Sequence, residues 1–329
     1  MLKEILDLLS PLMRKKLVDS IPNEHLKEIE EIRLRVNRPV EVVMHKGSQF
    51  IEELHLSRAE SREFLARISQ HSVYRLEEEL KKGFITLHGG HRIGLSGSVN
   101  VQDGKIKAIN HISSFNIRIA KAVIGSAEHL VPYVKDKHSR FLNTLIVGPP
   151  KSGKTTILRD LIRQISDGKN GFSNHRVGLI DERNEIAATH EGIPQQPVGQ
   201  RTDVMSNCPK AEGILMMIRS MAPEVIAVDE IGNEQDTRGL LEAIYAGVNL
   251  VCSVHGSSIG DIKKRPSIQP LIKERAIQRI ILLDAHGKPG TIKAVYNQQF
   301  EEMKGMTRSM RNEMDRRHPH PIHVHVGRS

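Results

Sequence analysis

A glycine-rich octapeptide at residues 148–155 constrains this chain of 329 residues more than any other feature. Its sequence, GPPKSGKT, fits the pattern GxxxxGK(S/T). It stands between the apolar segment 142–147 and a helical run that begins near Ile157. This order of strand, loop and helix predicts a phosphate-binding P-loop, because glycines let backbone N–H groups face the phosphates and the helix N-terminus adds its dipole. The predicted nucleotide-binding residues are Gly148, Pro149, Pro150, Lys151, Ser152, Gly153, Lys154, Thr155 and Thr156.

The loop predicts that ATP binds with Mg²⁺, and a second motif supports this. Lys154 is expected to neutralise the β- and γ-phosphates, and the Thr155 hydroxyl to bind the metal. Further along the chain, the apolar segment 225–228 ends in Asp229 and Glu230, the pattern of a Walker B strand. Asp229 is expected beside Mg²⁺ and Glu230 beside the attacking water. Acids are also common where a strand simply ends in solvent, but adjacent acids after a P-loop favour hydrolysis over kinase chemistry.

Two more predicted strands end in ionisable side chains. The second strand of the C-terminal half leads into Asp181, Glu182 and then Glu185, and the fourth leads into His255. In an open parallel sheet, ligands gather at the carboxyl ends of the strands. Glu182 and Glu185 are therefore further candidates for activating water, and His255 is a candidate for sensing the γ-phosphate. A helix cap at Asp181 or Glu182 and an ordinary loop histidine are the alternatives.

The hydrophobic pattern changes near residue 141 and predicts two domains. Residues 1–140 read as a small α+β domain with a hairpin turn at Asp103-Gly104. In residues 141–299, uniformly apolar strands alternate with helices, which indicates an α/β domain with a mostly parallel sheet covered on both faces. A Pro-, Gln- and Gly-rich loop is expected at 189–210.

The last segment, residues 300–329, is expected to be a flexible tail. It contains four histidines, and metal binding there is an open alternative, although nothing in the spacing defines a geometry. The rest of the chain offers no metal motif, because Cys208 and Cys252 are its only cysteines and they form no CxxC or zinc pattern.

Composition argues against two other classes of protein. The net charge is +9, from 48 basic and 39 acidic side chains, but the basic residues are spread along the chain, and aromatic residues make up only 3%. Proteins that bind single-stranded nucleic acid usually concentrate positive charge and stack bases on aromatic rings. No apolar run reaches the roughly 18 residues needed to span a bilayer. We therefore expect a cytoplasmic protein without a membrane span.

Four motifs in this order resemble the ring-forming ATPases of type II and type IV secretion and pilus systems. They are the P-loop, an acidic box at 181–185, the Walker B strand and a His box that ends in Ser253-Val254-His255. Two positions depart from that pattern, since Asp229 stands where many members have glycine and Val254 replaces leucine. The resemblance implies a RecA-like ATPase domain in the C-terminal half, with ATP and Mg²⁺ as cofactors.

The match is closer to the sporulation members of this family, from endospore-forming bacteria, and covers the chain up to about residue 298. It implies a hexameric ring whose nucleotide site is completed by N-terminal arginines, here Arg92 and Arg118; surface salt bridges are the alternative for both. It also implies partners among the membrane proteins of the stage III sporulation channel complex, and peripheral attachment through them to the mother-cell membrane. The segments that carry the closer match are 31–35, 38–39, 92–97, 199–210 and 222–226.

The expected function is an ATP-hydrolysing ring motor. It would energise assembly of, or transport through, a membrane channel between mother cell and forespore. Two alternatives stay open: a RecA-like nucleic-acid translocase, and a nucleotide-binding scaffold without turnover. Stimulation by single strands would favour the first, and the intact P-loop and Walker B residues argue against the second.

Overall fold

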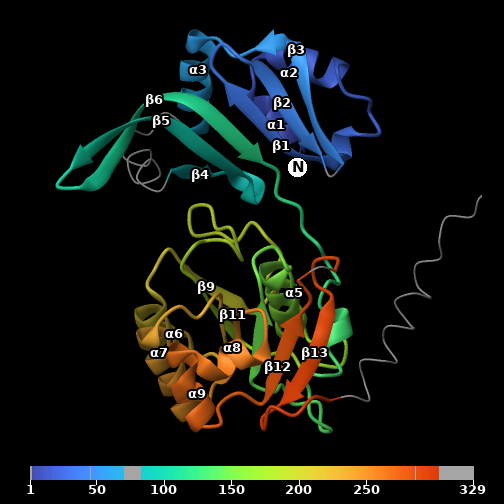
Figure 1. Cartoon of the computed structure of the whole chain (residues 1–329), viewed down its shortest axis with the longest axis vertical. Coiled ribbons are helices and arrows are strands. Elements are labelled where there is room, and N and C mark those ends of the chain that lie inside the picture. Colours follow the sequence, from blue (N-terminus) through green and yellow to red (C-terminus); the bar gives the residue numbers. More distant parts are fainter. Residues whose placement is uncertain (1, 45, 70–82, 286, 304–329) are drawn as a thin grey trace, which may run out of the picture. The chain divides into compact units, whose positions relative to one another are not determined.

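The protein has a mixed α/β fold (Figure 1), which we describe from a computed structural model that covers residues 2–44, 46–69, 83–285 and 287–303. The chain forms two compact units. The first comprises the described residues up to Ala122 together with Ala188–Gln196, and the second comprises Val123–Ala187 and the described residues from Pro197 onward. The chain therefore passes from one unit to the other three times.

The first unit is built on an antiparallel sheet. Its six strands lie in the order β3-β2-β1-β6-β5-β4, and every neighbouring pair is antiparallel. Apolar side chains of three helices pack with those of the sheet into one core. The elements are α1 (Leu2–Leu8), α2 (Pro11–Asp19), η1 (Leu26–Glu28), β1 (Ile29–Arg35), β2 (Pro39–Met44), β3 (Gly47–His55), α3 (Arg58–Ile68), β4 (Phe84–Thr86), η2 (His88–Gly90), β5 (Arg92–Gln102) and β6 (Lys105–Arg118).

The predicted hairpin turn is confirmed between β5 and β6, which extend as a long ribbon in Figure 1. Asp103 and Gly104 both have positive φ, 52° and 73°. This is the backbone that a two-residue turn of type I′ needs, since it matches the right-handed twist of the flanking strands. Asp and Gly tolerate that conformation better than other residues, which is why the dipeptide predicted the turn.

The second unit is built on a seven-stranded sheet in the order β13-β12-β7-β11-β10-β8-β9. All neighbouring pairs are parallel except β12 with β13. The elements are η3 (Glu128–Leu130), β7 (Thr144–Gly148), α5 (Lys154–Asp167), β8 (Val177–Asp181), β9 (Thr202–Ser206), α6 (Lys210–Met221), β10 (Val225–Val228), α7 (Glu234–Tyr245), β11 (Asn249–His255), α8 (Ile259–Lys264), η4 (Pro266–Ile268), α9 (Gln269–Lys273), β12 (Arg279–Leu283) and β13 (Ile292–Asn297).

This sheet is buried on both faces, which explains its uniformly apolar strands. One hydrophobic cluster joins α5 to side chains such as Ile146 and Val251, and the other joins α6 and α7 to side chains such as Leu145 and Val228. Alternate residues of one strand thus enter opposite clusters. Every residue of β7, β8 and β10 is buried.

The boundary between the units lies earlier than the change of sequence pattern near residue 141. The carboxylate of Asp160, on α5, is 2% exposed and accepts hydrogen bonds from the backbone N–H groups of Gly125 (3.1 Å) and Ala127 (2.9 Å). Leu130 and Tyr133 are buried in the same cluster as α5. These contacts fix the segment after Ala122 to the second unit, although its sequence continues the irregular pattern of the first.

The segment 189–210, which the sequence predicts to be a loop, contains a strand in the structure. Ala188–Gln196 belongs to the first unit, where Gln195 Oε1 accepts a hydrogen bond from Gly89 N (2.7 Å) and His190 Nδ1 lies 3.1 Å from Thr86 O. The loop prediction is wrong for Thr202–Ser206, which forms the edge strand β9. Its residues are only half-buried and include polar side chains, so the strand lacks the apolar signal of its neighbours.

Among the described residues, no helix is long and apolar enough to cross a membrane. Residues 304–329 of the expected tail, with its histidines, lie outside the described residues, so the flexible-tail prediction stays a prediction.

Candidate functional site

The P-loop connects β7 to α5 in the second unit and depends on two glycines. Gly153 has φ +91°, and a Cβ there would lie 2.7 Å from Gly290 N. A Cβ on Gly148 would lie 2.4 Å from Ser152 Oγ. Neither position has room for a side chain, so the loop can keep its backbone close to a bound group. A side chain at either glycine would have to displace these neighbours, whereas the binding of phosphate by the loop stays a prediction.

Lys154 begins α5, and its side chain folds back over the loop. Its Nζ donates hydrogen bonds to Gly148 O and Pro149 O, both at 2.8 Å. Burial lowers the pKa of Lys154, while the carboxylates of Asp229 and Glu230 act in the opposite direction. The ammonium group is thus held within the loop and is partly shielded from water, where a charge interacts more strongly with a phosphate.

Asp229, directly after β10, faces the helix that begins at the P-loop. Its Oδ2 lies 3.4 Å from the hydroxyl of Thr155, which donates to it, and its Oδ1 accepts a hydrogen bond from Ser253 Oγ at 2.7 Å. Burial raises the pKa of Asp229, and the nearby charges of Glu185 and Glu230 raise it further; the Ser253 hydrogen bond and Lys154 oppose this. Packing of β10 beside β11 and α5 brings these three side chains together.

The donors around this point fit magnesium bound together with a nucleotide. A carboxylate and a hydroxyl are hard oxygen ligands, and Mg²⁺ usually takes one or two protein ligands with phosphates and water. In the part of the chain that the structure describes, no group of three or more His, Cys, Asp and Glu side chains could hold a metal by itself. Asp229 and Thr155 are therefore the residues that would hold Mg²⁺, with phosphate oxygens completing its shell.

Asp181, at the end of β8, has a structural role. It is 1% exposed, and its carboxylate accepts hydrogen bonds from the backbone N–H groups of Glu185 (2.8 Å), Ile186 (3.0 Å) and Ala187 (2.9 Å). Arg159 of α5 holds the same turn, since its guanidinium donates to Ile186 O (2.5 Å) and Glu185 O (2.7 Å). Asp181 therefore stabilises a turn, and the described residues directly after it form no helix, so the helix cap that the sequence left as an alternative is not what the structure contains. Arg159 connects this turn to the P-loop helix.

The three glutamates predicted as candidates for activating water have different partners. Glu182 forms an ion pair with Lys210 of α6, whose side chain is 8% exposed. Glu230 pairs with Arg183, with Nη1 3.0 Å from Oε2. Glu185 is exposed at the turn held by Asp181, and its charge is the largest carboxylate contribution that raises the pKa of Asp229. The charges of Glu185 and Glu230 therefore both raise the pKa of Asp229, whereas Glu182 is paired with Lys210 of α6.

His255, at the end of β11, lies beside the start of the P-loop in the strand register, opposite Gly148. Its side chain is exposed, and its carbonyl accepts a hydrogen bond from Arg265 Nη1 at 2.5 Å. The backbone of His255 therefore lies beside the backbone of the P-loop at Gly148. A contact between the imidazole and a phosphate stays a prediction.

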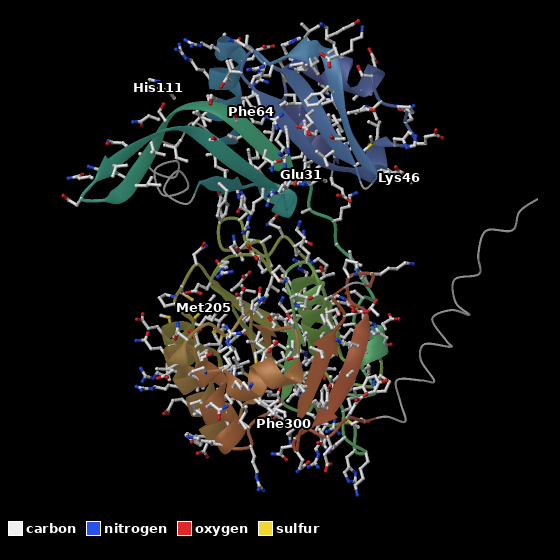
Figure 2. All side chains as sticks on the ribbon, in the orientation of Figure 1. Glu31, Lys46, Phe64, His111, Met205 and Phe300 are labelled. Carbon is white, nitrogen blue, oxygen red and sulfur yellow. The ribbon has the colours of Figure 1, made fainter. Side chains whose placement is uncertain are left out.

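Arg92 and Arg118 lie in the first unit, where they are direct cross-strand neighbours on β5 and β6. The Arg92 guanidinium stacks 4.2 Å from the centre of the Phe84 ring, and Arg118 Nε lies 3.4 Å from Glu31 Oε1. Figure 2 labels Glu31 on its sheet. The structure thus brings the two arginines together, but their action on a nucleotide stays a prediction because the phosphate site belongs to the second unit.

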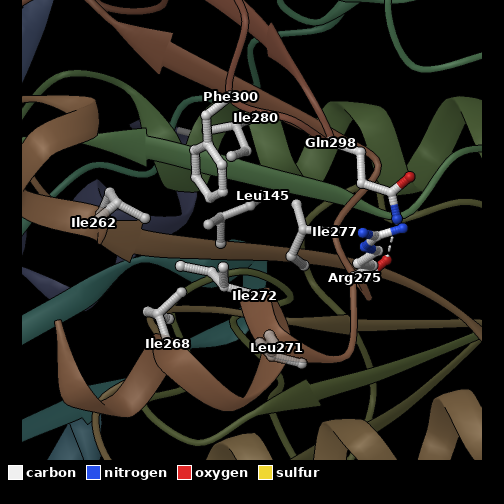
Figure 3. Close-up of a pocket in the computed structure, with 10 residues that line it drawn as sticks. All are labelled: Leu145, Ile262, Ile268, Leu271, Ile272, Arg275, Ile277, Ile280, Gln298 and Phe300. Carbon is white, nitrogen blue, oxygen red and sulfur yellow. Dashed lines mark hydrogen bonds between the residues drawn. The ribbon is translucent and has the colours of Figure 1, made fainter. Parts of the chain in front are cut away.

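The second unit also contains an apolar pocket, shown in Figure 3, between α8, η4, α9 and β12. Phe300 and Gln298 close one side, and Gln298 Nε2 donates a hydrogen bond to Arg275 O at 2.5 Å. Its volume of about 10 Å³ has room for about one water molecule. It is far too small for a nucleotide, so the phosphate site is the better candidate.

Sequence reasoning assigned no role to Ser253 or Arg159. The signal for Ser253 is a polar residue in a strand whose other inner residues are apolar, and the signal for Arg159 is a cation on the helix that follows the P-loop. Both signals are weak without the fold, because their partners lie on other strands and turns.

Comparison with known proteins decides the family. The family model described as sporulation stage III, protein AA matches residues 2–303. The chain belongs to this family. The stage III sporulation protein AA of Bacillus subtilis (strain 168) is 48% identical over 302 residues, which cover 90% of this chain and 95% of that protein. The family predicted from the sequence motifs is therefore confirmed.

Solved structures show that the family has the fold of secretion and pilus ATPases. The Legionella pneumophila ATPase DotB aligns with a TM-score of 0.57 and 14% identity, over 93% of this chain and 84% of its own. The pilus retraction motor PilT with bound ADP aligns with a TM-score of 0.55 and 16% identity, over 92% and 89%. At these identities the likeness concerns the fold, and the chemistry has to be argued from the site.

Proposed function

We propose that the protein hydrolyses ATP in a Mg²⁺-dependent reaction. The observation that carries this proposal is the convergence of Thr155 and Asp229 within 3.4 Å at the start of α5, directly after a glycine loop that holds Lys154. Thr155 lies on α5 and Asp229 directly follows β10, 74 residues further along the chain. Together with the loop and Lys154, they provide N–H donors, a cation and oxygen ligands at one point, which is what a magnesium nucleotide requires.

Each group has a distinct task in the proposed reaction. Loop N–H groups bind the phosphates and Lys154 offsets their charge. Thr155 and Asp229 would hold Mg²⁺, which would supply further positive charge to the phosphates. A carboxylate, Glu230 or Glu185, accepts a proton as the water oxygen forms its bond to the γ-phosphorus. The bond from phosphorus to the bridging oxygen breaks, and ADP and phosphate leave.

We also propose that this hydrolysis drives a homo-hexameric ring motor. It would act on the membrane proteins of the stage III sporulation channel complex and attach peripherally through them to the mother-cell membrane. Family membership supports the sporulation setting. The likeness to a pilus retraction motor supports the fold of a motor.

The first test compares ATP hydrolysis by the wild type and Lys154→Ala. We expect Lys154→Ala to reduce turnover by about 100-fold or more, because it removes a cation that stabilises the transferred phosphoryl group. Lys273→Ala, an exposed lysine on α9, is the matched control and should hydrolyse ATP as the wild type does.

Three results would contradict the proposal. Equal turnover by Lys154→Ala would exclude this loop as the active site. Nucleotide binding by the wild type without turnover at any protein concentration would favour the scaffold alternative. Hydrolysis that requires single-stranded nucleic acid would favour the translocase.

A further inference from the structure

Ser253 is a fully buried hydroxyl in the middle of an apolar strand. It is 0% exposed, and so are its neighbours Cys252 and Val254 on β11. A hydroxyl removed from water is costly unless hydrogen bonds replace its lost hydration. The Ser253 hydroxyl makes two such hydrogen bonds, since its Oγ donates to Asp229 Oδ1 at 2.7 Å and accepts from Glu230 N at 3.1 Å.

The same residue also holds the backbone beyond the end of β10. The register between β10 and β11 ends at Val228 opposite Cys252. One residue further, Ser253 O accepts a hydrogen bond from Ile231 N at 2.8 Å. Main chain and side chain of Ser253 therefore bind two successive N–H groups of the turn that follows the strand.

This turn needs an external constraint. Glu230 has φ +43°, in the left-handed region that residues with a side chain rarely adopt. Such a backbone persists where the surroundings over-determine it. The two hydrogen bonds that Ser253 accepts from Glu230 N and Ile231 N provide that constraint, and they set the direction in which the chain leaves Asp229.

The side-chain bond also fixes the rotation of the Asp229 carboxylate. With Oδ1 held by Ser253, Oδ2 is the oxygen that faces the Thr155 hydroxyl. A metal ligand whose second oxygen is held by a neighbouring donor is pre-oriented, and loss of such a partner typically weakens metal binding.

We propose that Ser253 is a positioning residue of the magnesium site, which orients the Asp229 carboxylate toward the metal and holds the Glu230 backbone. This inference rests on the proposed function, because it assigns a role within the same site. Ser253 contacts neither the nucleotide nor the metal in this arrangement and acts through Asp229 and Glu230.

The experiment compares Ser253→Ala, Ser253→Cys and Ser253→Thr. Alanine removes the hydroxyl, cysteine keeps a similar shape with only a weak donor, and threonine keeps the hydroxyl. Ser267→Ala is the matched control, because Ser267 is also a buried serine but its Oγ has no hydrogen-bond partner among the described residues. Two quantities are measured: the Mg²⁺ concentration for half-maximal ATP hydrolysis, and the Kd of a fluorescent ADP analogue with Mg²⁺ and with EDTA.

We expect Ser253→Ala and Ser253→Cys to need about 10- to 100-fold more Mg²⁺, the usual cost of losing a partner of a metal ligand. Their Kd for the ADP analogue in EDTA should match that of the wild type, and Ser253→Thr should restore the Mg²⁺ response. A merely structural role would weaken binding in EDTA as well, or would shift the control equally. Unchanged Mg²⁺ dependence in a folded Ser253→Cys would overturn the proposal.

The two proposals fail in distinguishable ways. If the wild type hydrolyses no ATP, the proposed function fails, while the Mg²⁺-dependent part of ADP-analogue binding still tests Ser253. If the wild type hydrolyses ATP and Ser253→Ala responds to Mg²⁺ as the wild type does, only the positioning role fails. If Ser253→Ala does not fold, Ser253→Cys and Ser253→Thr decide the question.

Discussion

At the scale of residues, hydrogen-bond partners separate side chains that look equivalent in the sequence. Asp181 and Asp229 both follow a buried apolar strand, and burial raises the pKa of each. Asp181 uses its oxygens on three backbone N–H groups, whereas Asp229 presents one oxygen to Ser253 and the other to Thr155. The first carboxylate therefore stabilises a turn, and the second is free to take part in metal binding.

The same reasoning ranks the three glutamates as candidates for activating water. We expect one of the two variants Glu230→Gln and Glu185→Gln, the one that removes the general base, to reduce kcat for ATP by about 100-fold or more, with ATP affinity near the wild-type value, since a lost general base usually costs about 10²- to 10⁴-fold. Glu182→Gln should keep most of the turnover and lower the thermal midpoint, because Glu182 is the partner of the buried Lys210. Steady-state kinetics with thermal unfolding distinguish these effects. A Glu182→Gln variant as inactive as the less active of the other two would reverse the ranking.

At the scale of elements, α5 joins the phosphate site to the segment that enters the second unit. Lys154 lies at its first residue, Arg159 one turn later holds the acidic turn, and Asp160 holds residues 125–127. The buried Arg163 side chain also pairs with Asp160, with Nη2 2.7 Å from Oδ1. Movement of the segment after Ala122 is therefore linked to the helix that carries the P-loop.

Breaking this anchor should destabilise the second unit. We expect Asp160→Ala to lower its free energy of unfolding by about 3–5 kcal/mol, the cost of leaving a buried charge without its partner. Asp261→Ala is the control, because it removes an exposed carboxylate of α8 that accepts a hydrogen bond from Ser257 N at 3.1 Å, and it should cost much less than Asp160→Ala. The labelling rate of the buried thiol of Cys252 in a Cys208→Ala background reports opening of this unit alone. Equal labelling in both variants would show that Asp160 is not an anchor.

At the scale of the whole molecule, the chain links its two units at three points, and one lies next to the acidic turn. The turn held by Asp181 ends at Ala187, and the next residues, Ala188–Gln196, belong to the first unit. The candidate nucleotide site therefore belongs to one unit, and Arg92 and Arg118 belong to the other. The chain passes between these two units three times. A motor needs such a link between chemistry and domain motion.

We predict that turnover depends on both arginines and on assembly. Arg92→Ala and Arg118→Ala should reduce ATP hydrolysis by about 10³-fold or more, as loss of an inserted arginine does in related NTPases, while nucleotide binding stays near normal. Arg62→Ala, an exposed arginine on α3, is the control. Specific activity of the wild type should rise with protein concentration in parallel with the mass of the particle in solution. Full activity as a monomer would exclude a shared site.

The sequence motifs of the candidate site could be recognised because their signals are local. The octapeptide around Lys154, the acids after the strand 225–228 and the Asp103-Gly104 turn each depend on residues adjacent in sequence, where steric freedom and hydrophobic pattern act directly. The edge strand β9 was not predictable from the same rules, since its half-buried residues carry no apolar signal. Nor was the early boundary at Ala122, which depends on contacts with Asp160 about forty residues away.

The amino-acid sequence by itself determined the family. It also predicted the P-loop as the phosphate site and Asp229 as the metal-side acid, because each of these predictions depends on a short contiguous pattern. Only the tertiary structure decided what the other polar groups do. Asp181 accepts hydrogen bonds from a turn, Glu182 forms an ion pair with Lys210, and Ser253 donates a hydrogen bond to Asp229. Each of these roles depends on which strands and helices pack side by side. Burial then sets the cost of leaving such a group without a partner, and that cost favours the arrangement in which the buried carboxylates of Asp181 and Asp229 accept hydrogen bonds.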